Sequence, residues 1–173
     1  LFGDGWKVNV RMDYEAEEKP VGTSGPLRLI PDLPSHFLVM NGDVLTDIDF
    51  GEFYRTHSDA NRLFTISSYE REQHVDFGVL VSGEGGTLRD FKEKPTSTFE
   101  VSMGVYMVSR EILPLIPIGQ PYGFDNLMHD LLRANRPVHV SRFDGYWLDI
   151  GRPDDYMKAI DEFQAMRQRF RLD

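Results

Sequence analysis

The chain has 173 residues, of which 40% are hydrophobic and 12% aromatic, and these values are typical of one packed domain. Its net charge is −9 and it has no cysteine, so we expect no nucleic-acid or anionic-membrane partner, no disulfide and no thiolate metal site. Because no apolar run approaches the roughly 18 residues of a membrane span, and no signal-peptide pattern is seen, we expect a cytoplasmic location.

Alternating strand and helix patterns begin early in the chain and predict an α/β sheet with helices on its faces. Residues 8–14 are expected to form a strand and residues 25–30 a short helix. The continuous apolar run at residues 37–40 predicts a buried parallel strand that leads into the loop Asn41-Gly42-Asp43. Asp49 is placed to cap a following helix whose apolar positions repeat every three or four residues.

The middle of the chain is expected to be rich in strands. Strand patterns occur at residues 64–68, 77–81, 88–92 and 101–108, and the glycine-rich residues 83–86 predict a hairpin turn between the second and the third.

Helices and short strands are expected to alternate toward the C-terminus. A helix from Ser109 should be shortened by Pro114 and Pro117, and Asp125 is placed to cap the next helix. Residues 138–143 and 146–150 then read as extended segments. A last helix is expected from Pro153, with one apolar face made by Tyr156, Ile160, Phe163 and Phe170.

Two aspartates stand at the ends of apolar segments, Asp43 after residues 37–40 and Asp149 within residues 146–151. Ligands of open α/β sheets collect beyond the carboxyl ends of strands, and paired carboxylates there suit Mg²⁺. Taken singly, each aspartate is better explained as a turn or capping residue. That the two aspartates together bind a metal ion is therefore a hypothesis.

Two further segments have residues suited to phosphate or sugar. In Phe91-Lys92-Glu93-Lys94-Pro95, strand alternation puts the two lysines on one face unless Pro95 bends the end. A lysine there could hold a phosphate and Glu93 could accept hydrogen bonds from sugar hydroxyls, although a solvated charged edge is the better explanation of this run taken by itself. The turn Val21-Gly22-Thr23-Ser24-Gly25 could offer backbone N–H groups to a base or phosphate, or simply connect elements.

In their order and approximate spacing, six segments together resemble the nucleotidyltransferase family that activates sugar 1-phosphates. They are residues 22–25, 38–43, 77–80, 93–95, 103–106 and 146–151. The resemblance implies a three-layer Rossmann-like fold with a mostly parallel sheet. It also implies that residues 1–173 are one partial catalytic domain, the C-terminal portion, without the family's N-terminal strand and glycine-rich nucleotide-binding loop.

The resemblance implies a catalytic metal site and a phosphate-binding lysine. Asp43 and Asp149 match the aspartates that bind Mg²⁺, and Lys94 matches the lysine that holds the sugar phosphate. In the implied reaction, a hexose 1-phosphate attacks the α-phosphate of a nucleoside triphosphate, and pyrophosphate leaves. Nothing in the sequence matches the Arg- and Lys-bearing loop, so we expect little or no transferase activity from this chain alone. An uncovered sheet edge should favour a homo-oligomer.

Four more residues match substrate-binding positions of the family. Glu93 and Gly78 correspond to sugar contacts and Gly22 to the position where the base is contacted. Ser102 stands where many relatives carry Asn, which puts its own sugar contact in doubt.

Three alternatives remain. A glycosyltransferase with an Asp-x-Asp metal motif would use Asp47-Ile48-Asp49, although Asp49 is also the expected helix cap. A non-catalytic regulatory relative would bind a nucleotide-sugar and control a partner. A plain interaction domain would leave the six ordered segments unexplained.

Overall fold

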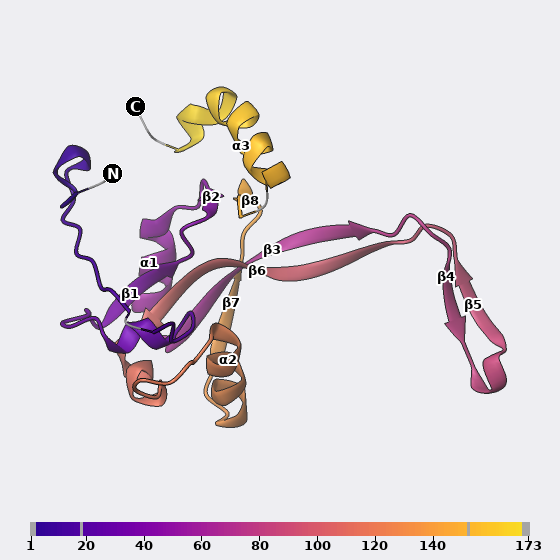
Figure 1. The fold of residues 1–173 in the computed structure, drawn as a ribbon, viewed down its shortest axis with the longest axis horizontal. Helices are drawn as coiled ribbons and strands as arrows, with labels where there is room; N and C mark the ends of the chain where they lie inside the picture. The colour runs from indigo at the N-terminus through magenta and orange to yellow at the C-terminus, as the bar shows by residue number, and fades with distance from the viewer. Residues whose placement is uncertain (1–2, 18, 152, 171–173) are drawn as a thin grey trace.

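A computed structural model describes residues 3–17, 19–151 and 153–170 (Figure 1). Its central sheet has four strands, in the order β1 (His36–Met40), β6 (Thr96–Ser109), β3 (Phe64–His74) and β7 (Val138–Arg142). β6 runs antiparallel to both of its neighbours, and β3 runs parallel to β7. β1, β3 and β7 therefore point the same way and β6 opposes them.

Helices cover both faces of this sheet, because the side chains of β6 alternate between two apolar clusters. On one face Met103, Val105 and Met107 pack with Phe53 of α1 (Phe50–Ser58). On the other face the cluster joins β1, β3 and β6 to α2 (Phe124–Arg133) through Phe37, Phe64, Tyr106, Val108, Leu127 and Leu131. The three-layer α/β arrangement expected from the sequence is confirmed.

Both of these helices begin at residues with extended backbone. The side chain of Asp49 accepts a hydrogen bond from the Glu52 amide at 2.9 Å, so its predicted capping role is confirmed. Asp125 does not cap α2. That helix is capped at Gly123, whose amide donates to the Asn126 side chain at 2.8 Å, while Asp125 lies in the first turn.

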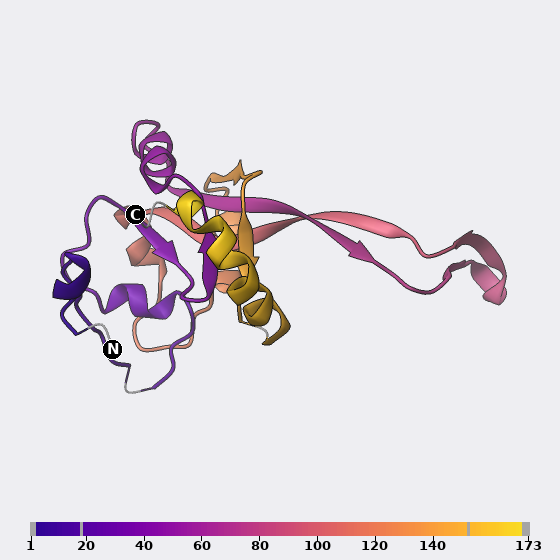
Figure 2. The ribbon, with the colours of Figure 1, turned by 90° about the horizontal axis from the view of Figure 1, so that it is seen from above.

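A two-stranded arm projects from the body of the molecule (Figures 1 and 2). β3 and β6 leave the sheet together, paired as far as His74 and Thr96. At their end lies a hairpin of β4 (Val79–Ser82) and β5 (Leu88–Lys92). The predicted turn between these strands is present as the 3₁₀ turn Glu84–Gly86.

Short elements complete the fold. β2 (Val44–Thr46) pairs antiparallel with β8 (Trp147–Asp149), and α3 (Pro153–Met166) follows β8. Further 3₁₀ segments are Trp6–Val8, Gly25–Arg28, Arg110–Leu115 and Arg167–Phe170. No helix of the described residues is long and apolar enough to cross a bilayer.

Two further predictions about local structure were wrong. Residues 8–14 are not a strand, because a 3₁₀ segment ends at Val8 and residues 11–14 have no regular structure. β1 is not a buried parallel strand: among the described strands it pairs only with β6, antiparallel, and Leu38 and Met40 are exposed. The helix expected from Pro153 is present as α3. Of its predicted apolar face, Phe163 is half-buried and stacks on Phe170 at 5.6 Å, whereas Tyr156 and Ile160 are half exposed. Each error concerns what an element packs against, which its own residues do not determine.

Candidate active site

The pairing of β2 with β8 brings Asp43 and Asp149 together. Val44, the residue after Asp43, pairs with Asp149. The amide of Ile150 donates to the carbonyl oxygen of Asp43 at 2.8 Å. Two segments far apart in the chain are thus fixed side by side, with a carboxylate at the end of each.

Gly151 separates the two carboxylates. A Cβ atom built on Gly151 would lie 2.9 Å from Asp43 Oδ2 and 3.1 Å from Asp149 Oδ1. The two oxygens are therefore no farther apart than the sum of those distances, roughly 6 Å. The Gly151 amide donates to Asp149 Oδ1 at 3.0 Å and orients that side chain. Glycine here leaves open the space that both carboxylates face.

The pair has the chemistry of a divalent-cation site that is completed by other ligands. Both aspartates are exposed, and neither carboxylate forms an ion pair with a described residue. Among the described residues no group of three or more His, Cys, Asp or Glu side chains could hold a metal ion. Two carboxylates that leave most positions to water and phosphate oxygens fit Mg²⁺ better than a metal that needs a full protein cage.

A cavity of about 290 Å³ opens beside Asp149. Trp147 forms one wall, held by a hydrogen bond from its Nε1 to the Met103 carbonyl oxygen at 3.0 Å and by a ring contact with Tyr69 at 5.3 Å. Ser102 lines the same cavity, donates to the Tyr106 hydroxyl at 3.1 Å and accepts from the Gly104 amide at 3.3 Å. Burial raises the pKa of Tyr106, so this hydroxyl stays protonated and able to donate.

Asn41 and Gly104 fix the loop that carries Asp43, a role that the sequence analysis missed. The Asn41 amide donates to the Gly104 carbonyl oxygen at 2.9 Å. Gly104 has φ +75°, and a Cβ there would lie 2.7 Å from Asn41 Nδ2. A glycine inside a strand is the signal that could have indicated such a close approach.

The turn at Gly22 lies beside a second cavity, but its amides are largely used within the protein. The Ser24 and Gly25 amides donate to the Tyr122 carbonyl oxygen at 3.1 and 3.0 Å. Gly22 has φ +80°, and a Cβ there would collide with Tyr122 at 2.8 Å. The turn therefore anchors the segment before α2, and the Ser24 and Gly25 amides are not open to a base or phosphate, in agreement with the connecting role that the sequence analysis gave as the other possibility.

The two cavities adjoin each other. The second cavity is lined by Thr23 and Ser24 and shares Asn41, Tyr106 and Phe124 with the first. The rings of Tyr106 and Phe124 stack at 4.4 Å between them. The two cavities thus lie side by side, one beside the Gly22 turn and the other beside Asp149.

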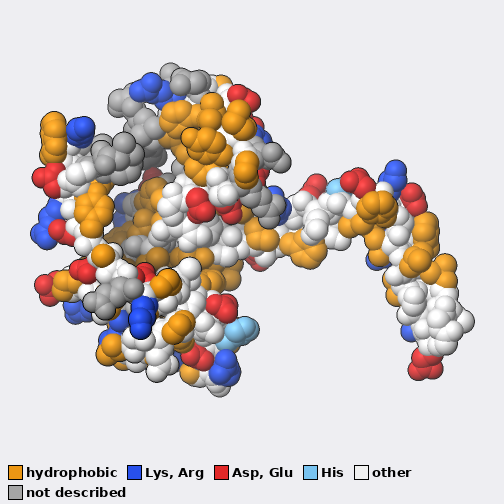
Figure 3. Space-filling view, viewed as in Figure 1, with side chains coloured by type: hydrophobic (Ala, Val, Ile, Leu, Met, Phe, Trp, Pro, Cys, Tyr) orange, Lys and Arg blue, Asp and Glu red, His pale blue; other side chains and the backbone are white. Residues whose placement is uncertain are grey.

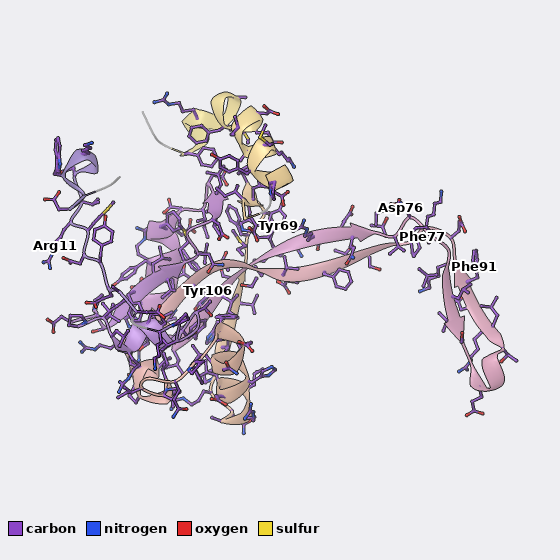
Figure 4. The ribbon with its side chains drawn as sticks, viewed as in Figure 1. Arg11, Tyr69, Asp76, Phe77, Phe91 and Tyr106 are labelled. Atoms are coloured by element: carbon purple, nitrogen blue, oxygen red, sulfur yellow. The ribbon has the colours of Figure 1, made fainter. Side chains whose placement is uncertain are left out.

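Gly78, Glu93 and Lys94 lie together at the far end of the arm, away from the aspartates. A Cβ on Gly78 would lie 3.3 Å from Glu93 Oε2, so those two positions are adjacent. Ser102 and Thr96 are six residues apart on β6, a span of about 20 Å in a strand. Figure 4 shows Asp76, Phe77 and Phe91 at the arm's end and Tyr69 and Tyr106 near the body. The structure therefore gathers the predicted site residues into two groups.

The segment around Lys94 is bent, as Pro95 suggested. β5 ends at Lys92, and Lys94 has φ +42°, so the two lysines do not continue one strand. The Val75 amide donates to the Pro95 carbonyl oxygen at 3.1 Å on the opposite strand. The joint between arm and hairpin thus lies at the segment expected to bind the sugar phosphate.

The Asp-x-Asp alternative finds no support in the geometry. Asp47 Oδ1 accepts from the Tyr146 amide at 2.7 Å, and Asp49 caps α1. Both carboxylates hold backbone groups, so their positions are explained by structure.

Comparison with known proteins agrees with these features. Residues 1–165 match the family described as Nucleotidyl transferase. The chain is 29% identical over 160 residues to a mannose-1-phosphate guanyltransferase of Yarrowia lipolytica, covering 88% of this chain and 44% of that protein. It is 29% identical over 179 residues to a UTP–glucose-1-phosphate uridylyltransferase of Synechocystis, covering 92% and 46%. The chain thus spans less than half the length of these relatives.

Solved structures share the fold. HddC from Yersinia pseudotuberculosis superposes with a TM-score of 0.66 at 25% identity, covering 94% of this chain and 71% of that one. The same protein has been solved in complex with GMP-PN. A putative glucose-1-phosphate thymidylyltransferase from Bacillus anthracis has a TM-score of 0.65 at 17% identity, covering 91% of this chain and 67% of that one, which bears on the fold alone. With the match over residues 1–165, the chain belongs to the nucleotidyl transferase family.

Proposed function

We propose that this chain contributes the metal-binding and sugar-phosphate-binding part of a sugar-1-phosphate nucleotidyltransferase. The reaction joins a hexose 1-phosphate to the nucleotidyl group of a nucleoside triphosphate and releases pyrophosphate. The observation that carries the proposal is the convergence of Asp43 and Asp149 around Gly151. Mannose 1-phosphate and glucose 1-phosphate, which the names of the relatives include, are the first sugars to test.

The aspartate pair would hold Mg²⁺. That ion supplies charge neutralisation between two anionic substrates and orients the phosphate oxygens. The carboxylates set its place beside the cavity that Trp147 and Ser102 line, and a protein of net charge −9 needs such a local cation.

Bond making then depends on positioning by the protein. An oxygen of the sugar phosphate attacks the α-phosphorus of the triphosphate in line, and the bond from that phosphorus to the leaving pyrophosphate breaks. No covalent enzyme intermediate is needed. Ser102 would contact the sugar in the cavity, and the hollow near Gly22 would take the base.

The arm must move for Lys94 to take part. Glu93, Lys94 and Gly78 are held about 20 Å from the cavity by the β3–β6 ribbon. Bending at the base of the β3–β6 ribbon, where the register shifts between Ile66 and Ser68, would carry Glu93 and Gly78 to the sugar and Lys94 to its phosphate. We therefore include closure of the arm as a step that precedes chemistry.

We also propose that the protein associates with itself. Exposed hydrophobic side chains gather on the hairpin and over α3 (Figure 3). On the hairpin they are Phe77, Leu80, Leu88 and Phe91. Together with the edge strand β1, they favour self-association.

We also propose that residues 1–173 act as part of one catalytic domain and that the protein works in the cytoplasm.

The reaction can be tested on protein expressed from the whole reading frame. Pyrophosphate release is measured with a panel of nucleoside triphosphates, each paired with mannose 1-phosphate or glucose 1-phosphate and Mg²⁺. Asp43→Asn and Asp149→Asn are each expected to lower kcat by about 100-fold or more, because charge stabilisation of the transition state is lost. Tight binding of a nucleotide-sugar without pyrophosphate release from any pair would instead favour the regulatory alternative.

A further inference from the structure

Arg71 of β3 stands beside the aspartate pair, at the base of the arm. It pairs with Phe99 on β6, two residues beyond the pair of Tyr69 and Val101. Residues two apart on a strand share a face, so Arg71 lies on the same side as Tyr69, whose ring contacts Trp147. Figure 4 shows Tyr69 where the arm leaves the body.

Two cavities meet at this arginine. Arg71, Trp147 and Asp149 line the 290 Å³ cavity described above. The same three residues line a third cavity, of about 220 Å³, together with Asp155 and Lys158 of α3. Arg71 is thus the basic residue common to both hollows that border Asp149.

Within the described part of the chain, the guanidinium of Arg71 forms no hydrogen bond or ion pair, and its side chain is exposed. Arg142, on the neighbouring strand β7, is by contrast held by Glu70 at 3.0 Å and by Asp144 at 3.0 Å. Lys158, the other basic residue that lines the third cavity, pairs with Glu162 at 3.8 Å. Of these three basic side chains, Arg71 is the one without a partner among the described residues.

An uncommitted arginine beside two carboxylates suits one class of ligand. The planar guanidinium offers parallel N–H groups that match two oxygens of a phosphate, and this geometry is stronger than a point charge. We propose that Arg71 binds the phosphate of the sugar 1-phosphate, through the phosphate oxygens that face away from Asp43 and Asp149. This inference rests on the proposed function and adds a phosphate-binding residue that the sequence patterns did not indicate.

The position of Arg71 gives it a role distinct from that of Lys94. Arg71 lines the cavity while the arm is extended, whereas Lys94 follows β5 at the arm's end, the region that Phe77 and Phe91 mark in Figure 4. Arg71 therefore holds the sugar phosphate in the open molecule, and Lys94 reaches it on closure. The sugar phosphate can then bind before the arm closes.

The inference is tested by isothermal titration calorimetry of the 173-residue chain with mannose 1-phosphate and with glucose 1-phosphate, in the presence of Mg²⁺. Arg71→Ala is expected to weaken binding of the sugar phosphate about tenfold or more, as for loss of a charge-assisted hydrogen bond. Arg71→Lys should restore only part of the loss, because the bidentate geometry is missing. Binding of the unphosphorylated sugar should be the same in all variants.

The control is Arg133→Ala, which removes an exposed arginine of α2 that lines neither cavity beside Asp149. It should leave the affinity unchanged, and the melting temperatures of all variants should agree with that of the wild type. If the wild-type chain binds a sugar phosphate and Arg71→Ala binds it equally well, this inference fails and the proposed function stands. If the wild-type chain binds neither sugar phosphate, both are overturned.

Discussion

Asp43 and Asp149 face a common point from two sides of Gly151, at 2.9 and 3.1 Å from where its Cβ would be. This relationship explains why a glycine follows so soon after Asp149. Any side chain at position 151 would occupy the space between the carboxylates, where a bound cation and its phosphate ligands would lie.

Gly151→Ala is therefore expected to weaken Mg²⁺ binding about tenfold, because the methyl group forces both carboxylates apart. The measurement is a calorimetric titration of Mg²⁺ into each variant. Gly42→Ala is the control, since a Cβ on Gly42 meets nothing within 4 Å although the residue adjoins Asp43. Equal affinities for the two variants would show that the space at Gly151 is not the metal site.

Gly104→Ala should destabilise the fold through its collision with Asn41. The left-handed backbone and the 2.7 Å approach to Asn41 Nδ2 together should cost about 1–3 kcal/mol in the free energy of unfolding, measured with urea. Gly119→Ala has a similar φ of +68° but open space around it, so it reports the backbone strain alone. In an Asn41→Ala background the extra cost of Gly104→Ala should disappear. A cost that persists there would mean that Asn41 is not the obstacle.

His57 should make stability fall as the solution is acidified. Burial and the nearby His36, Arg62 and His139 lower the pKa of His57 from 6.5 to about 4. Its Nδ1 lies 2.9 Å from Thr65 Oγ1, and its buried Nε2 has no partner in the described structure. Between pH 6.5 and 4 the unfolded chain binds a proton that the folded chain does not, so the free energy of unfolding decreases over that window.

The loss due to His57 should reach no more than about 3 kcal/mol and should level off below pH 4. Urea titrations from pH 7.5 to 4 on the wild type and on His57→Gln measure it. The variant should be less stable at pH 7.5 and should show a weaker pH dependence. An identical pH dependence in both proteins would mean that His57 is protonated equally in the folded and unfolded states.

The local elements of the fold were predictable, whereas their packing was not. Asp49 caps α1 through a bond to an amide three residues away, so four residues contain the whole signal. The antiparallel pairing of β1, in contrast, depends on β6, which lies more than fifty residues later. The sequence of β1 alone is equally apolar in either arrangement.

The candidate site shows the same division. Asp43 and Asp149 could be expected to meet because each ends an apolar segment at a glycine. The distance of Lys94 could not be foreseen, because it depends on the bend beside Pro95 and on the length of pairing between β3 and β6. Arg71 was missed because an arginine in a polar, alternating strand looks like any solvent-facing charge.

Closure of the arm can be followed directly because the chain has no cysteine. Spin labels on Lys92→Cys at the arm's end and Thr56→Cys on α1 report the distance between hairpin and body by pulsed electron paramagnetic resonance. Addition of Mg²⁺ and mannose 1-phosphate or glucose 1-phosphate should shorten that distance by about 10 Å or more, given an arm of about 20 Å. The same labels in an Asp43→Asn background should show no change. If the distance between the labels stays the same on addition of the ligands in both backgrounds, closure of the arm is ruled out.

The binding of a divalent cation by the chain itself tests the central claim most directly. Titration of Mn²⁺, followed by the loss of its free-ion resonance signal, should reveal a site that Mg²⁺ competes for. Asp43→Asn and Asp149→Asn should each abolish that site, while Asp47→Asn should retain it. If both single variants bind Mn²⁺ as the wild type does, or if Asp47→Asn alone loses it, the two aspartates are not the metal site.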